Sequence, residues 1–258
     1  MKINDNPINN INVYMNRMQK SVLDKMFFMD KVFDSFSSII DFGCANGELI
    51  KALQSLFGEY RYIGYDISDE MLLAAHENVP SAEFCSEWNE MNVDFTDSLL
   101  NISSTLHEVY SYSSQEEIEK FWSRVFESGF KYIAIRDMML SDAEQQTADT
   151  AQYNLVVMNE NYANKLNDYE SIWGKISTQH DLVHYLLKYK YTENWEREVR
   201  ENYVPITLEQ LLAIVPSNYE ITYLNHFTLP YIAWQIKNDF GIELITPTHI
   251  KLILQRKD

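Results

Sequence analysis

The sequence has 258 residues, with 21 Lys and Arg side chains against 38 Asp and Glu, which gives a formal net charge of −17. A chain of this length can bury roughly 70–75% of the surface that its unfolded form exposes, so it can fold without disulfides or a structural metal. The 46% hydrophobic and 14% aromatic content excludes an intrinsically disordered protein, and the acidic balance argues against a nucleic-acid partner.

The two cysteines, Cys44 and Cys85, form no C-x-x-C motif, and the first residues lack a basic region followed by an apolar run. We therefore expect a cytoplasmic protein with no disulfide framework. No apolar stretch approaches the roughly 18 residues that a membrane span needs, so we expect no membrane partner. The sequence does not define the oligomeric state.

The first segment, 1–36, is predicted to be an N-terminal helical cap, because apolar residues recur at helical spacing over 11–36. Strands and helices then alternate. Strands are predicted at 37–44, 60–68, 82–88, 98–107 and 130–138, and helices at 46–58, 69–79 and 114–129. Ser68 or Asp69 is the expected N-cap of the second helix, and Ser114 begins the third. Such alternation predicts an α/β fold with a parallel sheet and helices on both faces.

The alternation stops after the fifth strand. Residues 139–206 contain one Gly and no Pro before Pro205, which predicts a helical insertion or lid, with helices at 141–166 and 178–201. A return helix at 207–215, capped by Thr207, then precedes strands at 219–229 and 248–257. No flexible linker flanks the insertion, so 1–258 is predicted to be a single domain.

The sequence D-F-G-C-A-N-G directly follows the first strand and opens a helix, which places Asp41, Gly43 and Gly47 at one turn. Asp66 ends the next strand, 23 residues after Gly43. A glycine turn lets a ligand approach the backbone, and an acid about 20 residues further on can accept both hydroxyls of a ribose. The pattern predicts a nucleoside site at the carboxyl ends of the strands.

A nicotinamide dinucleotide is the less favoured nucleoside. Its fingerprint is G-x-G-x-x-G, whereas this turn is G-x-x-x-G with Ala45 in the place of the second Gly. Asp41 would also repel a pyrophosphate and would suit a ligand that carries an ammonium group. An NAD-dependent oxidoreductase therefore stays an alternative that this turn argues against.

The segments I-I-D-F-G-C-A-N-G-E-L and Y-I-G-Y-D-I-S-D-E-M-L resemble the class I S-adenosylmethionine-dependent methyltransferases. The first motif of that family is D-x-G-x-G-x-G, and its second strand ends in an acid. The resemblance implies a Rossmann-like three-layer sandwich whose seven-stranded sheet is mostly parallel, with an antiparallel last strand. It also implies S-adenosylmethionine as the cofactor, and it covers about 40–138 motif by motif.

The resemblance implies a set of cofactor-binding residues. Gly43, Ala45 and Gly47 would form the turn against the amino-acid part, which Asp41 would orient, and Asp66 would accept the ribose hydroxyls. The remaining members would be Ile67 and Met71 beside the adenine, Glu87 and Trp88 at its amino group, and Ser103 and Ser104 near the sulfonium.

The acceptor is expected at the segment S-S-T-L-H-E-V-Y that follows the fourth strand. Methyl transfer depends mainly on alignment, with removal of a proton when the acceptor is a hydroxyl or a protonated amine. His107 is the preferred catalytic base because the usual pKa of histidine is near 6.5. Glu108, Tyr110 and Arg136 are the candidate substrate residues, although Arg136 and Asp137 can also form a mutual salt bridge.

The insertion carries nine Tyr and Trp residues and no Phe, which is typical of a lid or an interface where one end of each ring is wet. His180 and His184 have a metal-compatible spacing but lack the H-E-x-x-H pattern, so no metal is predicted. The charges of E-R-E-V-R-E at 196–201 are predicted to form a solvated helix face.

These features predict methyl transfer from S-adenosylmethionine to an oxygen or nitrogen of a small molecule or a protein. Two further alternatives remain. One is an RNA (tRNA) methyltransferase, which the charge of −17 argues against. The other is a non-catalytic module that binds S-adenosylmethionine and interacts with proteins through the insertion.

Overall fold

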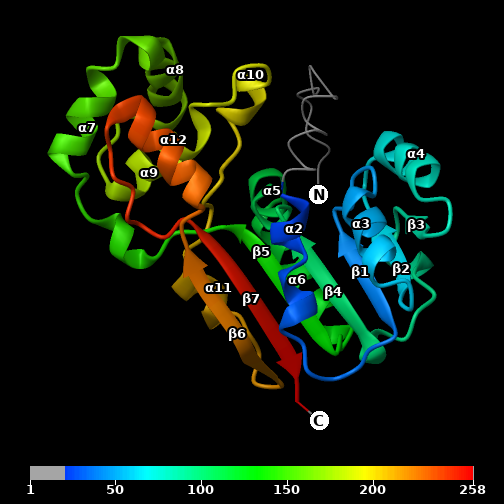
Figure 1. The fold of residues 1–258 in the computed structure, drawn as a ribbon. Coiled ribbons are helices and arrows are strands. Elements are labelled where there is room, and N and C mark those ends of the chain that lie inside the picture. Colours follow the sequence, from blue (N-terminus) through cyan, green and yellow to red (C-terminus); the bar gives the residue numbers. More distant parts are fainter. Residues whose placement is uncertain (1–20, 258) are drawn as a thin grey trace.

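The computed structural model describes residues 21–257, which form a seven-stranded sheet with helices on both faces (Figure 1). The strand order is β3-β2-β1-β4-β5-β7-β6. The strands are β1 (Ser38–Phe42), β2 (Arg61–Tyr65), β3 (Glu83–Cys85), β4 (Ser98–Ser103), β5 (Tyr132–Met138), β6 (Tyr219–Phe227) and β7 (His249–Arg256).

The first five strands pair in parallel, and β7 lies antiparallel between β5 and β6. This arrangement confirms the predicted α/β fold with an antiparallel last strand. Because the order reverses between β1 and β4, the carboxyl ends of these two strands form the crevice in which open α/β sheets bind their ligands.

Two helical layers enclose the sheet. On one face, α2 (Val22–Lys25), α3 (Glu48–Leu56) and α4 (Asp69–Asn78) pack around core residues such as Ile39 and Leu99. On the other face, α5 (Leu106–Tyr112), α6 (Gln115–Glu127) and α11 (Leu208–Ala213) pack around residues such as Ile40 and Leu100. Successive β-strand side chains point to opposite faces, so both faces of each central strand are apolar.

Polar residues begin the helices where the sequence predicts. The Ser68 hydroxyl accepts a hydrogen bond from Met71 N, and Ser114 and Thr207 cap α6 and α11 in the same way. Each bond satisfies a backbone N–H that the first turn of a helix cannot satisfy by itself.

Three predicted elements were wrong in extent. The fourth strand ends at Ser103 and not at 107, because α5 begins within that segment. The third strand is only three residues long, and Trp88–Glu90 form a 3-10 turn. Of the helix predicted over 11–36, the described part holds α2 and a 3-10 turn at Phe27–Asp30, and its first ten residues lie outside the described residues.

The insertion after β5 forms a lobe beside the sheet, which we call the cap (Figure 1). It consists of residues 139–206 together with α12, because one buried cluster contains side chains from both. Its helices are α7 (Thr150–Val157), α8 (Ala163–Trp173), α9 (Gln179–Lys188), α10 (Trp195–Glu198) and α12 (Pro230–Phe240). The sequence predicted the helical insertion but not the addition of α12.

The cap helices are shorter than predicted because polar side chains start new turns within the predicted ranges. Asp149 accepts a hydrogen bond from Gln152 N and begins α7, and Asn159 accepts one from Asn161 N where α7 has ended. Asp and Asn compete with helical hydrogen bonding in this way.

The tyrosines of the cap are mostly buried, so the expectation of a wet, aromatic surface was wrong for them. Tyr169, Tyr185 and Tyr189 are each at most 1% exposed. Their hydroxyls bond inside the cap, as in the 2.8 Å contact from Tyr189 to Asp239 on α12. A buried tyrosine requires such a partner, and these bonds join α12 to the insertion.

Within residues 21–257, no helix combines the length and the apolar character that a membrane span requires.

Candidate functional site

In the turn after β1, every second residue from 43 to 47 has a left-handed backbone conformation. The φ angles are +75° at Gly43, +45° at Ala45 and +75° at Gly47. Gly43 N donates to the Tyr65 carbonyl at 2.8 Å, which holds the turn against the end of β2. A Cβ on Gly43 would come within 2.5 Å of the Thr105 side chain. Glycine is therefore required at 43, whereas Ala45 adopts a conformation that is unfavourable for a residue with a Cβ.

Asp66 lies directly after β2, and its carboxylate holds the turn in place. Its Oδ2 accepts a hydrogen bond from Ala45 N at 2.8 Å, and its Oδ1 accepts one from Ser68 N at 2.9 Å. Burial raises the pKa of Asp66, although these backbone donors act in the opposite direction. Each carboxylate oxygen keeps further acceptor capacity, so Asp66 can bind a ligand as well.

The carboxyl end of β4 lies at the same edge of the sheet as the ends of β1 and β2. Ser104 has φ +57°, and its hydroxyl accepts a 3.0 Å hydrogen bond from the Arg136 guanidinium. The Ser103 hydroxyl donates to Asn101, whose amide donates to Asp41 at 2.7 Å. Burial raises the pKa of Asp41 to about 6, even though Asn101 and Lys25 favour the carboxylate.

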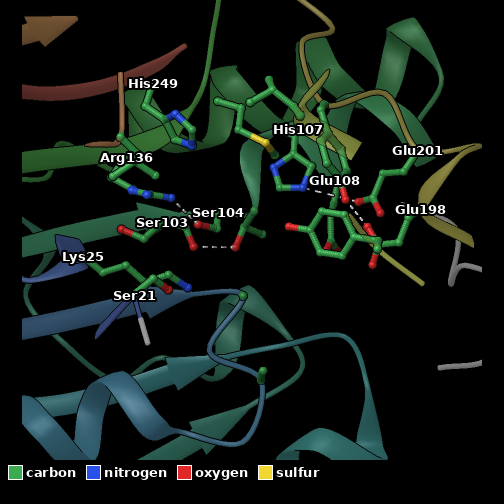
Figure 2. Close-up of a pocket in the computed structure, with 18 of the residues that line it drawn as sticks. Ser21, Lys25, Ser103, Ser104, His107, Glu108, Arg136, Glu198, Glu201 and His249 are labelled. Carbon is green, nitrogen blue, oxygen red and sulfur yellow. Dashed lines mark hydrogen bonds and ion pairs between the residues drawn. The ribbon is translucent and has the colours of Figure 1, made fainter. Parts of the chain in front are cut away.

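A cavity of about 290 Å³ lies between these strand ends and the cap. Gly43, Ala45 and Asp66 line it from the sheet, and Tyr191, Glu198 and Tyr203 are among the residues that line it from the cap. Its charges are separated in space (Figure 2). Lys25 and Arg136 lie at one end, and Glu108, Glu198 and Glu201 lie at the other.

The cationic end depends on α2. Arg136 pairs with Asp24 on that helix, with Nε 2.8 Å from Oδ2, and Lys251 pairs with the same carboxylate. Lys25 is 9% exposed, and burial lowers its pKa. The sequence did not suggest Lys25 as a site residue, because only the tertiary fold brings α2 to the strand ends.

A mutual salt bridge between Arg136 and Asp137 was a wrong prediction. Neighbours on a strand point to opposite faces, so Arg136 meets α2 and Asp137 meets α5. Asp137 is instead bonded to His107, with 2.7 Å between Oδ1 and Nδ1.

His107 lies at the acidic end, and both of its ring nitrogens face carboxylates. Its Nε2 is 3.4 Å from Glu201 Oε1. Burial alone would lower the pKa of His107, but Asp137 and Glu201 outweigh it and hold that pKa well above its usual value. The expectation of a base with a pKa near 6.5 was therefore wrong. These carboxylates keep the imidazole protonated at neutral pH while nothing else occupies Nε2.

The acids of the cap come from a segment that was expected to be solvated. Arg197, Glu198 and Glu201 are 7%, 6% and 3% exposed and line the cavity. The Arg197 guanidinium lies 3.6 Å from Glu108 Oε1. Burial and the neighbouring Glu201 raise the pKa of Glu108 to about 7. Charge patterning alone could not distinguish this buried turn from an exposed helix face.

A second cavity, of about 190 Å³, has a largely aromatic lining. Tyr65, Trp88 and Phe121 line it together with Ile67, the residue after Asp66. It is therefore adjacent to the large cavity, with Asp66 on one side and Ile67 on the other.

Comparison with solved structures shows which fold this is. The plantazolicin methyltransferase BamL, in complex with a triazolic desmethylPZN analog and SAH, is 12% identical with a TM-score of 0.54 and covers 93% of this chain and 85% of its own. An S-adenosylmethionine-dependent methyltransferase from Anabaena variabilis is 15% identical with a TM-score of 0.51, and all of both chains is covered. No curated protein matches the chain.

The family model of a methyltransferase domain matches residues 39–129. That range runs from β1 to α6 and contains both the turn at 43–47 and Asp66. The segment 39–129 is therefore a methyltransferase domain. The expected cofactor, S-adenosylmethionine, agrees with the SAH that the structure of the plantazolicin methyltransferase BamL contains.

Five of the predicted site residues of this methyltransferase line neither cavity: Asp41, Gly47, Met71, Glu87 and Tyr110. The Tyr110 hydroxyl accepts a 2.8 Å hydrogen bond from Trp122 between α5 and α6. Glu87 is exposed and bonds through its backbone N–H to Glu90. Met71 is buried at the start of α4. Tyr110 was expected beside the acceptor, but its hydroxyl is bonded to Trp122 on α6 instead.

The turn of the methyltransferase gives a matched pair of variants. Ala45→Gly should raise the free energy of unfolding by up to about 1 kcal/mol, because relief of left-handed strain exceeds the added entropy of the unfolded chain. Gly43→Ala should lower it by more than about 2 kcal/mol, because strain and the clash with Thr105 add. Urea unfolding measures both, and a loss of stability in Ala45→Gly would contradict this account of the turn.

Proposed function

We propose that this methyltransferase transfers a methyl group from S-adenosylmethionine to an oxygen or nitrogen of a small molecule or a protein segment held under the cap. One observation carries the proposal. Gly43, Ala45 and Asp66 of the cofactor turn line the same cavity as ionisable residues of the cap, among them Glu198 and Glu201. A cofactor and an acceptor can therefore meet in one cavity.

The two cavities support the residues that we propose for cofactor binding. Asp66 can accept the ribose hydroxyls, and Ile67 and Trp88 line an aromatic space suited to a flat base. At the other end, Lys25 and Arg136 provide positive charge for the carboxylate of the amino-acid part. Asp41 lines a smaller cavity beside this end, together with Lys25, Gly43 and Ser103, and its carboxylate suits an ammonium group.

Ala45, Gly47 and Ser104 complete this proposed set through their backbone. Ala45 and Ser104 both line the large cavity in left-handed conformations, which turn their peptide groups away from the regular strand and helix. Gly47 is the N-cap of α3. The proposed set leaves out Met71, which is buried at the start of α4, and Glu87, which is exposed.

The acidic end is the proposed acceptor site. Glu108, Glu198 and Glu201 would repel phosphate groups, which supports a small-molecule or protein acceptor over RNA. BamL is a structural neighbour that holds a desmethylPZN analog, and its fold has room for such a compound beside SAH. The tyrosines at 191 and 203 add aromatic surface at this end of the cavity.

The bound cofactor supplies a methyl group activated by its positively charged sulfur. The residues of the chain position the acceptor. Asp137 fixes the ring of His107 through Nδ1 and leaves Nε2 directed to the acceptor end, so His107 remains the proposed catalytic contact of the acceptor. The cap forms one wall of the cavity and can align the acceptor, and alignment is the main requirement of an in-line displacement.

Asp66→Ala should weaken S-adenosylmethionine binding by roughly 1–3 kcal/mol, the cost of losing charge-assisted hydrogen bonds. Calorimetric titration measures the affinity. Asp69→Ala is the matched control, because Asp69 is an exposed acid at the start of α4, three residues after Asp66. Unfolding of both variants should be measured, since Asp66 also holds Ala45 N and Ser68 N. Wild-type affinity in a folded Asp66→Ala variant would contradict the proposed ribose site.

Affinity for S-adenosylmethionine should fall as the pH is lowered from 7 to 5. Burial gives Asp41 a pKa of about 6 in the folded chain, so protonation in this range removes the charge proposed to face the ammonium group. Asp41→Asn should bind more weakly at pH 7 and show a smaller change with pH. Titrations at several pH values test this, and an unchanged pH profile in Asp41→Asn would exclude the role of Asp41.

The acceptor class is tested with methyl-labelled S-adenosylmethionine. The protein is incubated with the small-molecule, peptide and RNA fractions of a cell extract, and the label is counted in each. We expect label in a small-molecule or peptide fraction. Label confined to ribonuclease-sensitive material would overturn this acceptor class in favour of an RNA methyltransferase.

A further inference from the structure

Three side chains at the acidic end converge on one point. One ligand atom from each of His107, Glu108 and Glu201 lies within 4.8 Å of those of the other two. His107 and Glu108 are on α5, and Glu201 follows α10 in the cap, so the cluster joins the sheet domain to the cap (Figure 2).

The histidine of this cluster is held in the manner of a metal ligand. Asp137 Oδ1 lies 2.7 Å from His107 Nδ1 and accepts its proton, which fixes the ring and directs Nε2 to the two glutamates. Asp137 also accepts a hydrogen bond from His107 N. A carboxylate behind the distal nitrogen of a histidine is the usual support of a metal-binding imidazole.

Glu201 supplies a second, independent observation. It is 3% exposed, and among the described residues its Oε1 has no hydrogen-bond partner. The nearest cationic atom is His107 Nε2 at 3.4 Å, a contact that lacks hydrogen-bond geometry. A buried carboxylate oxygen without a hydrogen bond is costly, so this atom indicates a missing partner inside the cluster.

The neighbouring cations compensate the acids only in part. Arg197 lies at the edge, 3.6 Å from Glu108 Oε1 and 4.0 Å from Glu201 Oε2. Lys188 donates to the backbone carbonyls of Glu198 and Glu201 and not to their carboxylates. Tyr203 donates to Glu198. With Asp137, four carboxyl groups therefore face three cationic side chains, His107, Arg197 and Lys188.

We propose that His107, Glu108 and Glu201 bind a divalent transition-metal ion, with Mn²⁺ or Zn²⁺ as the class that one imidazole and two carboxylates suit. The sequence predicted no metal, because His180 and His184 lack the H-E-x-x-H pattern and no other metal motif was recognised. Since all three ligands line the large cavity, the remaining positions of the ion face that cavity. An oxygen of the acceptor can occupy one of them, so that His107 contacts the acceptor through the ion and not directly; this last part rests on the proposed function.

Metal binding is tested without the cofactor. Protein freed of metal with a chelator is titrated with Mn²⁺, followed by electron paramagnetic resonance, and with Zn²⁺, followed by calorimetry. We expect one ion per chain with micromolar affinity. Glu201→Gln should weaken binding at least tenfold, and Glu196→Gln, which changes an exposed residue of the same segment, should not. Glu108→Gln is the second test if Glu201→Gln does not fold, as judged by circular dichroism.

Absence of binding below millimolar ion, or equal affinity in wild type and in both folded ligand variants, would overturn the proposal. A parallel titration with S-adenosylmethionine separates the two claims. Cofactor binding without metal binding would remove only the metal site, whereas metal binding without cofactor binding would remove only the proposed function.

Discussion

The carboxylate of Asp66 is the interaction on which the rest of the site depends. It accepts hydrogen bonds from Ala45 N and Ser68 N, and so joins the turn after β1 to the start of α4. The turn needs such a bond, because Ala45 is held in a left-handed conformation that is unfavourable for it. The parallel pairing of β1 with β2 places both segments at the same edge of the sheet. The crevice that results is the entry to the large cavity.

The cap gives that crevice its second wall and its charge separation. Its core is made of tyrosines whose hydroxyls bond internally, and α12 is part of it. A rigid cap can hold Glu198 and Glu201 in a buried position, where an exposed loop would leave them in water. Opposite it, α2 contributes Lys25 to the cationic end. The two ends of the cavity therefore depend on segments that are distant in the sequence.

Much of the fold and the cofactor edge could be predicted from the sequence, because their signals are local. Strand and helix periodicity, the Ser and Thr caps and the glycine turn each depend on neighbouring residues, and Ser68, Ser114 and Thr207 cap helices as expected. The acceptor end could not be predicted in the same way. Its main features depend on contacts between segments that are distant in the sequence. These features are the burial of Glu201, the pairing of His107 with Asp137 and the position of Lys25 in the lining of the large cavity. The hydrophobic pattern also did not predict α5, the helix whose Tyr110 is bonded to Trp122 on α6.

The most direct measurement is a calorimetric titration of the protein with S-adenosylmethionine and S-adenosylhomocysteine, with NAD as the control ligand. The account predicts micromolar binding of both adenosyl compounds, one per chain, and no heat from NAD, because the turn at 43–47 lacks the dinucleotide glycines and carries Asp41. Binding of NAD without binding of either adenosyl compound would contradict the account.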